Sequence, residues 1–134
     1  MKNILLIFGL LLSLEGTALV TPVKAQTEVL QSTNAALRIG SAKELARYFN
    51  NMVELGFDGN KSSYSQTQAE FVLKDFFNKN TPVGFEIIHQ GASKEGLRYA
   101  IGKYSHKGGS YRVYMLLKQN RGTYVIDTID FTRE

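Results

Sequence analysis

Hydrophobic and polar positions change their period at Pro82. Before Pro82, apolar residues recur every three or four positions, which is typical of amphipathic helices. After it, apolar and polar residues alternate, as they do in strands that bury one face. Helices followed by antiparallel strands predict an α+β fold in which the helices cover one face of a sheet.

The clearest helix is predicted over residues 65–80. Ser65 and Gln68 have the spacing of a capping box, in which each side chain satisfies a free backbone N–H of the first turn. Asn80 suits a left-handed stop, and Pro82 prevents continuation. Apolar residues at helical spacing share one face of this segment: Ala69, Val72, Leu73, Phe76 and Phe77.

Two shorter helices are expected earlier in the chain. The first covers residues 27–37 and stops at Gly40, and Ser41 with Glu44 forms a capping box that opens the second. The apolar face of the second helix consists of Leu45, Tyr48, Phe49 and Met52. Residues 53–57 then alternate as a short strand, and residues 58–60 (Asp-Gly-Asn) form a turn.

Four alternating segments follow, over residues 85–90, 97–105, 111–118 and 123–132. Short loops that contain glycine separate them, which predicts an antiparallel meander. One alternating set is assigned to the face beneath the helices: Leu97, Tyr99, Ile101, Tyr111, Val113, Met115, Leu117, Val125, Asp127, Ile129 and Phe131. The other set is assigned to the outer face: Arg98, Tyr104, Arg112, Tyr114, Leu116, Tyr124 and Ile126.

The N-terminus has the pattern of a secretory signal peptide over residues 1–25. Lys2 precedes a short apolar run, and the small side chains of Val23 and Ala25 fit a peptidase site after Ala25. A membrane anchor is the alternative, but a span needs about 20 apolar residues and this run is shorter. We therefore expect a single α+β domain over residues 26–134, exported to the periplasm or secreted, with no membrane span after cleavage.

The amino-acid composition excludes several kinds of functional site. The chain has no cysteine, so it has neither disulfides nor a thiolate nucleophile. Its formal net charge is +4, and the basic residues are scattered, so no nucleic-acid partner is expected. His89 and His106 are far apart in sequence and have no carboxylate at ligand spacing, so neither a metal site nor a cofactor is expected.

Two candidate sites remain. The first is a pocket between helices and sheet, with polar groups from His89, Tyr99, Tyr111 and Asp127 and apolar walls from three residues: Phe76, Phe77 and Met115. The ordinary alternative is a filled core, with the polar groups hydrogen-bonded. The second candidate is an aromatic patch on the outer face of the sheet, suited to a symmetric dimer and formed by Tyr104, Arg112, Tyr114 and Tyr124.

Several segments carry a family resemblance: YSQTQAEFVLKDFF, FEIIHQG, YAIGKY, YRVYMLLK and YVIDTIDF. They resemble an uncharacterised family of small exported Bacteroidetes proteins, a domain of unknown function. The order of elements resembles the cone of the nuclear transport factor 2-like, or cystatin-like, fold. The resemblance implies neutral residues near position 127, so Asp127 departs from it, which weakens Asp127 as a family catalytic base.

The sequence therefore favours a non-catalytic domain that binds a small apolar ligand or a protein partner, with a homodimer through the outer face as a further possibility. The competing class is an isomerase- or hydratase-like enzyme, in which Asp127 acts as a base facing Tyr99 or Tyr111. Fold alone does not decide between them, because this fold hosts both enzymes and binding modules.

Overall fold

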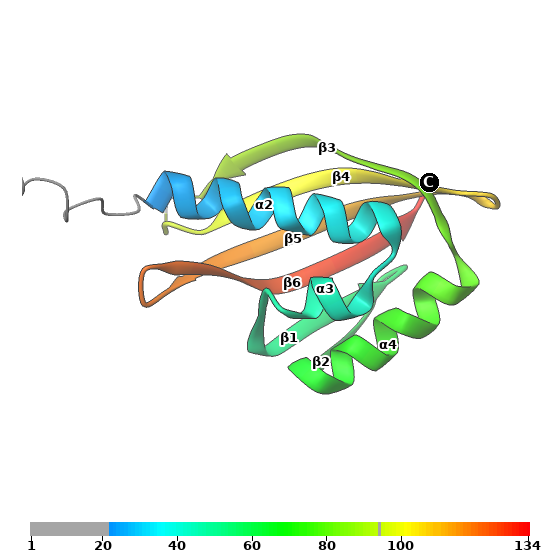
Figure 1. The fold of residues 1–134 in the computed structure, drawn as a ribbon, viewed down its shortest axis with the longest axis horizontal. Helices are drawn as coiled ribbons and strands as arrows, with labels where there is room; N and C mark the ends of the chain where they lie inside the picture. The colour runs from blue at the N-terminus through cyan, green and yellow to red at the C-terminus, as the bar shows by residue number, and fades with distance from the viewer. Residues whose placement is uncertain (1–21, 94) are drawn as a thin grey trace, which may run out of the picture.

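The computed structural model describes residues 22–93 and 95–134. Two helices come first, then a hairpin, a third helix and four long strands (Figure 1). The helices are α2 (Pro22–Ile39), α3 (Ala42–Ala46) and α4 (Gln66–Lys79). The strands are β1 (Phe49–Phe57), β2 (Asn60–Ser65), β3 (Pro82–Ala92), β4 (Arg98–His106), β5 (Gly109–Asn120) and β6 (Thr123–Arg133).

The strands form one six-stranded sheet in the order β2-β1-β6-β5-β4-β3. The meander from β3 to β6 is antiparallel, and β1 joins it by pairing in parallel with β6. All three helices lie against one face of the curved sheet, with α2 along β3 and α4 beside β1 and β2 (Figure 1). The predicted α+β architecture, with helices on one face of a curved sheet, is confirmed.

Helix α4 begins where its sequence predicts. Ser65 accepts a hydrogen bond from the backbone N–H of Gln68, whose side chain accepts one from the Ser65 N–H, so the capping box is complete. The stop differs from the prediction, because Asn80 is not left-handed: its φ is −132°. Its side-chain amide instead donates to the Phe76 carbonyl and caps the helix end directly.

The second predicted helix is much shorter than expected. Ser41 does accept from the Glu44 N–H, but α3 ends at Ala46 and Phe49 already lies in β1. The Ile126 N–H donates to the Tyr48 carbonyl, and Phe49 pairs with Ile126. Pairing with a strand distant in sequence therefore overrides the local helical pattern over residues 47–52.

The turn predicted at residues 58–60 joins β1 to a strand that the pattern did not reveal. Asp58 and Gly59 both have positive φ, which matches the twist of a tight hairpin. Strand β2 is polar and exposed over Asn60–Ser63, so it lacks the apolar alternation that marks a strand.

The two faces of strand β4 are the reverse of those predicted. Ala100 and Tyr104 are fully buried beneath the helices, whereas Tyr99 and Ile101 lie on the outer face. Both alternating sets contain apolar residues, so alternation alone does not show which set is inside. On the buried face of β4, Gly102 leaves room for the Phe85 ring, because a Cβ at position 102 would lie 2.3 Å from that ring.

Strand β6 changes phase in the middle. Leu117 pairs with Ile126 and Leu116 with Thr128, so Asp127 is an extra residue in a β-bulge. Tyr124 and Ile126 before the bulge, and Ile129 and Phe131 after it, all face the core. The prediction was right for the second pair and wrong for the first pair, and it also placed Val125 and Asp127 on the wrong face.

The space between helices and sheet is filled by side chains. Phe76 is central: its ring centroid lies 4.5 Å from that of Phe131 and 5.2 Å from that of Tyr111. The Tyr104 hydroxyl donates to the Asn80 carbonyl, and burial raises the pKa of Tyr104 well above its usual value, with a smaller contribution from Tyr111. Further fully buried side chains complete this core: Leu37, Leu45, Leu55, Leu73, Met115, Leu117, Ile126 and Ile129.

Candidate binding groove between α2 and β3

The residues of the predicted pocket fall into two groups on opposite faces of the sheet. Phe76, Phe77, Tyr111 and Met115 do lie together, but as tightly packed core: Met115 is fully buried, and the Phe76 and Phe77 ring centroids are 5.8 Å apart. The group belongs to the core, and its members Phe76 and Tyr111 also border a cleft of about 300 Å³ at the end of α4.

The other three predicted polar residues, His89, Tyr99 and Asp127, lie on the outer face of the sheet. His89 is exposed on the outer face, where its Nε2 is 3.0 Å from the Tyr99 hydroxyl. Asp127, at the bulge, accepts from the Asn50 amide at 3.3 Å and lies 3.5 Å from Lys118 Nζ. Asp127 and Tyr111 thus lie on opposite faces of the sheet, and Tyr111 pairs with Arg133, six residues beyond Asp127 along β6.

The predicted interface set is also divided. Arg112 and Tyr114 lie on the outer face as expected, but Tyr104 and Tyr124 are buried, at 0% and 4% exposed. The apolar neighbours of Tyr114 on the outer face are Tyr99, Ile101 and Leu116, and Asp130 lies opposite Tyr114 on β6. Tyr99 and Tyr114 stack with centroids 6.4 Å apart, so the outer face keeps an aromatic centre with different members.

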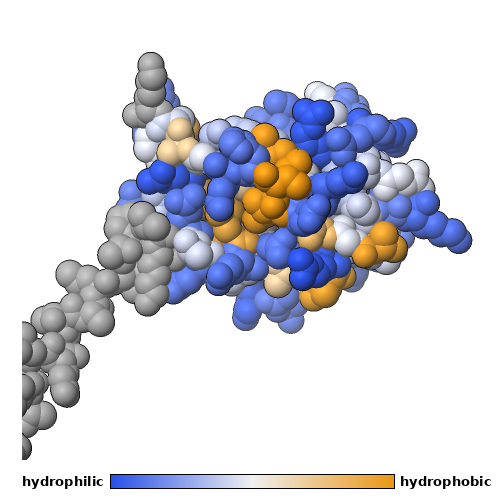
Figure 2. Space-filling model, turned by 90° about the horizontal axis from the view of Figure 1, so that it is seen from above, coloured by the Kyte–Doolittle hydropathy of each residue, from blue (hydrophilic) through white to orange (hydrophobic). Residues whose placement is uncertain are grey.

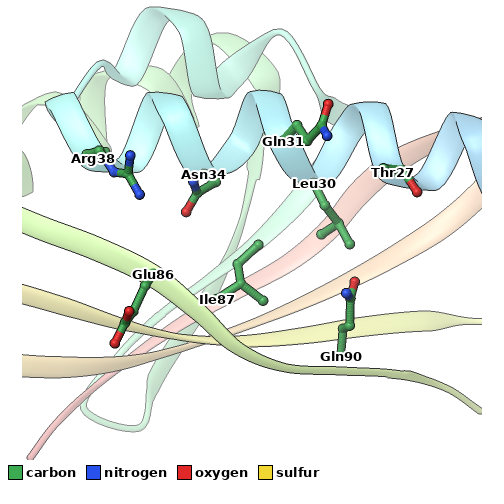
Figure 3. Close-up of a pocket in the computed structure, with 8 residues that line it drawn as sticks. All are labelled: Thr27, Leu30, Gln31, Asn34, Arg38, Glu86, Ile87 and Gln90. Carbon is green, nitrogen blue, oxygen red and sulfur yellow. The ribbon is translucent and has the colours of Figure 1, made fainter.

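A groove of about 430 Å³ runs between α2 and β3 (Figure 3). Leu30 points from α2 toward β3, while Ile87 and Gln90 point back from β3 toward α2. Leu30 is buried and Ile87 half-buried, so the groove has a small apolar centre flanked by amides. Its lining is Thr27, Leu30, Gln31, Asn34, Arg38, Glu86, Ile87 and Gln90.

Arg38 marks the end of this groove and the start of a second. Its Nη2 donates to the Phe85 carbonyl at 3.3 Å. Arg38 takes part in no ion pair among the described residues, although Glu86 lines both grooves with it. The second groove continues along the same strand and is lined by Arg38, Val83, Gly84, Phe85, Glu86, Lys103 and Ser105.

Sequence reasoning missed the groove, although α2 carries a signal for it. Thr27, Gln31, Asn34 and Arg38 recur at helical spacing beside the apolar stripe of α2. A polar stripe of this kind is also the ordinary solvated side of a helix. Only the position of β3 beside it makes the stripe the wall of a groove.

Residues 22–93 and 95–134 hold no cluster of three His, Cys, Asp or Glu side chains able to share a metal ion. None of the helices in these two ranges combines the length and the hydropathy needed to cross a bilayer.

The arrangement of helices on a curved six-stranded sheet places the chain in a fold class: it has the nuclear transport factor 2-like fold. It is similar to a protein of that fold, of unknown function, from Burkholderia xenovorans (12% identity, TM-score 0.64, covering 84% of this chain and 87% of the other). A domain with a cystatin-like fold from Nostoc punctiforme is similar at 10% identity and a TM-score of 0.65, over 84% and 77% of the two chains. At these identities the likeness concerns the fold alone.

The family follows from residues 30–132, which match the profile of DUF4783, a domain of unknown function. The chain belongs to the DUF4783 family. A family protein from Bacteroides ovatus shares 29% identity at a TM-score of 0.73, covering 77% of this chain and 93% of that one. Another, from Bacteroides fragilis, shares 25% identity at the same TM-score, over 77% and 96%. The comparison with curated proteins gave no match.

Proposed function

We propose that this chain is an exported, non-catalytic binding domain whose α2–β3 groove takes a small apolar ligand or a segment of a protein partner. The observation that carries the proposal is the contrast between core and groove. Beneath α2, Leu37 and Ile126 are fully buried and fill the cone. Beside α2, the half-buried Ile87 and the neighbouring amides line an open hollow, with the buried Leu30 at its base. A few convergent polar groups around an apolar centre are the usual composition of a binding site.

Export is part of this proposal and is supported by the N-terminal sequence. The predicted cleavage point after Ala25 falls within the first turns of α2, and residues 1–21 of the predicted signal peptide lie outside the described residues. Thr27, the first groove residue, follows that point, so cleavage there leaves the whole groove lining in the mature chain.

An isomerase- or hydratase-like reaction is less well supported. Such a mechanism needs a carboxylate base and a hydroxyl donor that face one substrate. Asp127 bonds to Asn50 and Lys118 on one side of the sheet, and Tyr111 packs on Phe76 on the other. Tyr99 is two strands away from Asp127, with its hydroxyl directed at His89.

Native mass spectrometry on the mature protein, purified from the compartment to which it is exported, tests the groove. We expect a bound mass on the wild type and its loss in Gln90→Trp, because the indole would occupy the space facing Leu30. Gln119→Trp is the matched control, since Gln119 is exposed on β5 and lies outside the groove. Retention of the mass in Gln90→Trp would refute the groove as its site.

A homodimer through the outer face is a second candidate, favoured by the half-buried cluster of Tyr99, Ile101, Tyr114 and Leu116. Apolar residues grouped on an open sheet face suit a self-complementary contact. If this contact forms, Tyr114→Glu should halve the mass measured by sedimentation, and Thr67→Glu on exposed α4 surface should not. A mass unchanged by Tyr114→Glu would exclude this face.

A further inference from the structure

Strand β3 is an edge of the sheet and presents unpaired main-chain groups. It pairs only with β4, and the register is regular from Gly84 to Ile87. The Phe85 carbonyl faces away from β4, because it accepts from Arg38 of α2. In an antiparallel pair, residues with their polar groups turned toward the partner alternate with residues turned away. The N–H groups of Phe85 and Ile87 and the Ile87 carbonyl therefore face the free side, next to the groove, where the Phe85 carbonyl already accepts from Arg38.

The side chains along this edge are unusually apolar for an exposed strand. Val83 and Ile88 are 74% and 59% exposed, and Figure 2, seen from the side on which β3 lies, shows apolar atoms amid a mostly polar surface. The other edge of the sheet differs, because β2 exposes Asn60, Lys61 and Ser62 there. Charged and polar side chains are a common protection against strand pairing. Each edge exposes one charged side chain, Lys61 on β2 and Glu86 on β3, so what distinguishes β3 is the exposure of Val83 and Ile88.

We propose that β3 accepts an extended segment of another polypeptide as an added strand, seated in the α2–β3 groove. This inference rests on the proposed function and names its partner class. Main-chain hydrogen bonds to the Phe85 N–H and to the N–H and C=O of Ile87 supply the affinity, and side-chain pockets supply the specificity. One side chain of the segment is apolar and packs on Leu30 and Ile87. Another is a carboxylate beside Arg38, which makes no ion pair among the described residues even though Glu86 lines the same groove.

The local irregularities of β3 set the length of the paired segment. The register shifts between Pro82 and Gly84 and again between Ile87 and His89, which leaves Gly84–Ile87 as the regular stretch. Bulges bend a strand and interrupt its ladder. A short pairing of this kind fits a reversible contact with a Kd in the micromolar range.

The test begins with a phage library of random peptides of about eight residues, close to the usual length of a strand. The library is selected on the mature domain, and clones that also bind Gln90→Trp are discarded. We expect enriched sequences with apolar residues at alternate positions and an Asp or Glu. Failure to enrich any peptide, or enrichment only of peptides that bind Gln90→Trp equally well, would overturn both this inference and the groove as a peptide site.

Backbone methylation then separates strand addition from other ways of filling the groove. The best peptide is made in two forms, N-methylated at odd or at even residues. Only one edge of an added strand faces β3, so one form should bind at least about tenfold more weakly and the other nearly unchanged. If both forms bind like the parent, or both fail, strand addition is wrong, while loss of binding in Gln90→Trp would still support the groove.

Charge is tested by Arg38→Met with the same peptide and its Glu→Gln or Asp→Asn analogue. Arg38→Met should bind the acidic peptide at least about tenfold more weakly than the wild type does, so that the acidic and neutral peptides bind with similar affinity. If Arg38→Met preferred the acidic peptide as strongly as the wild type does, Arg38 would be ruled out as the carboxylate partner. Lys74→Met, on the exposed face of α4, is the control for loss of one positive charge.

Discussion

Tyr104→Phe probes the buried hydrogen bond that ties β4 to the end of α4. The Tyr104 hydroxyl is the donor, the Asn80 carbonyl is the acceptor, and the Tyr104 side chain is fully buried. A buried intramolecular hydrogen bond contributes about 1 kcal/mol net, so the variant should lower the free energy of unfolding by about that amount at pH 7. Tyr114→Phe on the outer face is the matched control and should cost less than about 0.5 kcal/mol.

The same residue predicts a dependence on alkaline pH. Burial raises the pKa of Tyr104 in the folded state, whereas the unfolded chain loses this proton near pH 10. The protonated Tyr104 hydroxyl therefore stabilises the fold fully below the unfolded-state pKa. Above that pKa the free energy of unfolding falls by about 1.4 kcal/mol per pH unit. By pH 11 the loss in the wild type should be about 1.4 kcal/mol, while the phenylalanine variant has no proton to lose at this position. The two stability curves should therefore meet near pH 11.

Urea unfolding followed by circular dichroism, from pH 7 to pH 11, provides the measurement. The difference between wild type and Tyr104→Phe should shrink steadily above pH 10. A constant difference across this range would refute the reasoning, because it would mean that the Tyr104 hydroxyl ionises equally easily in the folded and unfolded chains. Stability unchanged by Tyr104→Phe at pH 7 would equally contradict a contribution from the bond to Asn80.

Two further changes test the fold by urea unfolding. Ser65→Ala removes the cap of α4 and should cost about 1 kcal/mol, whereas Ser62→Ala on exposed β2 should be nearly neutral; equal effects would argue against the cap. Gly102→Ala places a Cβ 2.3 Å from the Phe85 ring and should cost about 1–3 kcal/mol. Gly84→Ala meets no atom within 4 Å and should be tolerated; equal stability of the two alanine variants would contradict the packing of Phe85 on Gly102.

The sequence predicted those elements whose signals are local. Helix α4 contains its own cap, its apolar stripe and a proline beyond its end, so its position follows from a short stretch of chain. The meander strands are likewise bounded by their own glycine-bearing turns. The helix-then-sheet order, and with it the fold class, depended only on these local patterns.

What the sequence did not predict depends on contacts between distant segments. Phe49 lies in a strand because Ile126 is beside it, and the bulge at Asp127 is visible only from the pairing of β5 with β6. Each alternating set in β4 is partly apolar, so period-two reasoning could not choose the buried one. The same limit applied to the site, because the polar stripe containing Gln31 and Asn34 borders a groove only once β3 is in place.

NMR shift mapping tests the central claim that binding takes place between α2 and β3. The ¹⁵N-labelled mature domain is titrated with the peptide that the library selects, and the amide shifts are followed. Binding in the groove should give the largest changes over residues 27–38 of α2 and 83–90 of β3. Changes concentrated on the outer face around Tyr114, or in the cleft lined by Phe57, Lys79 and Arg133 at the end of α4, would contradict it.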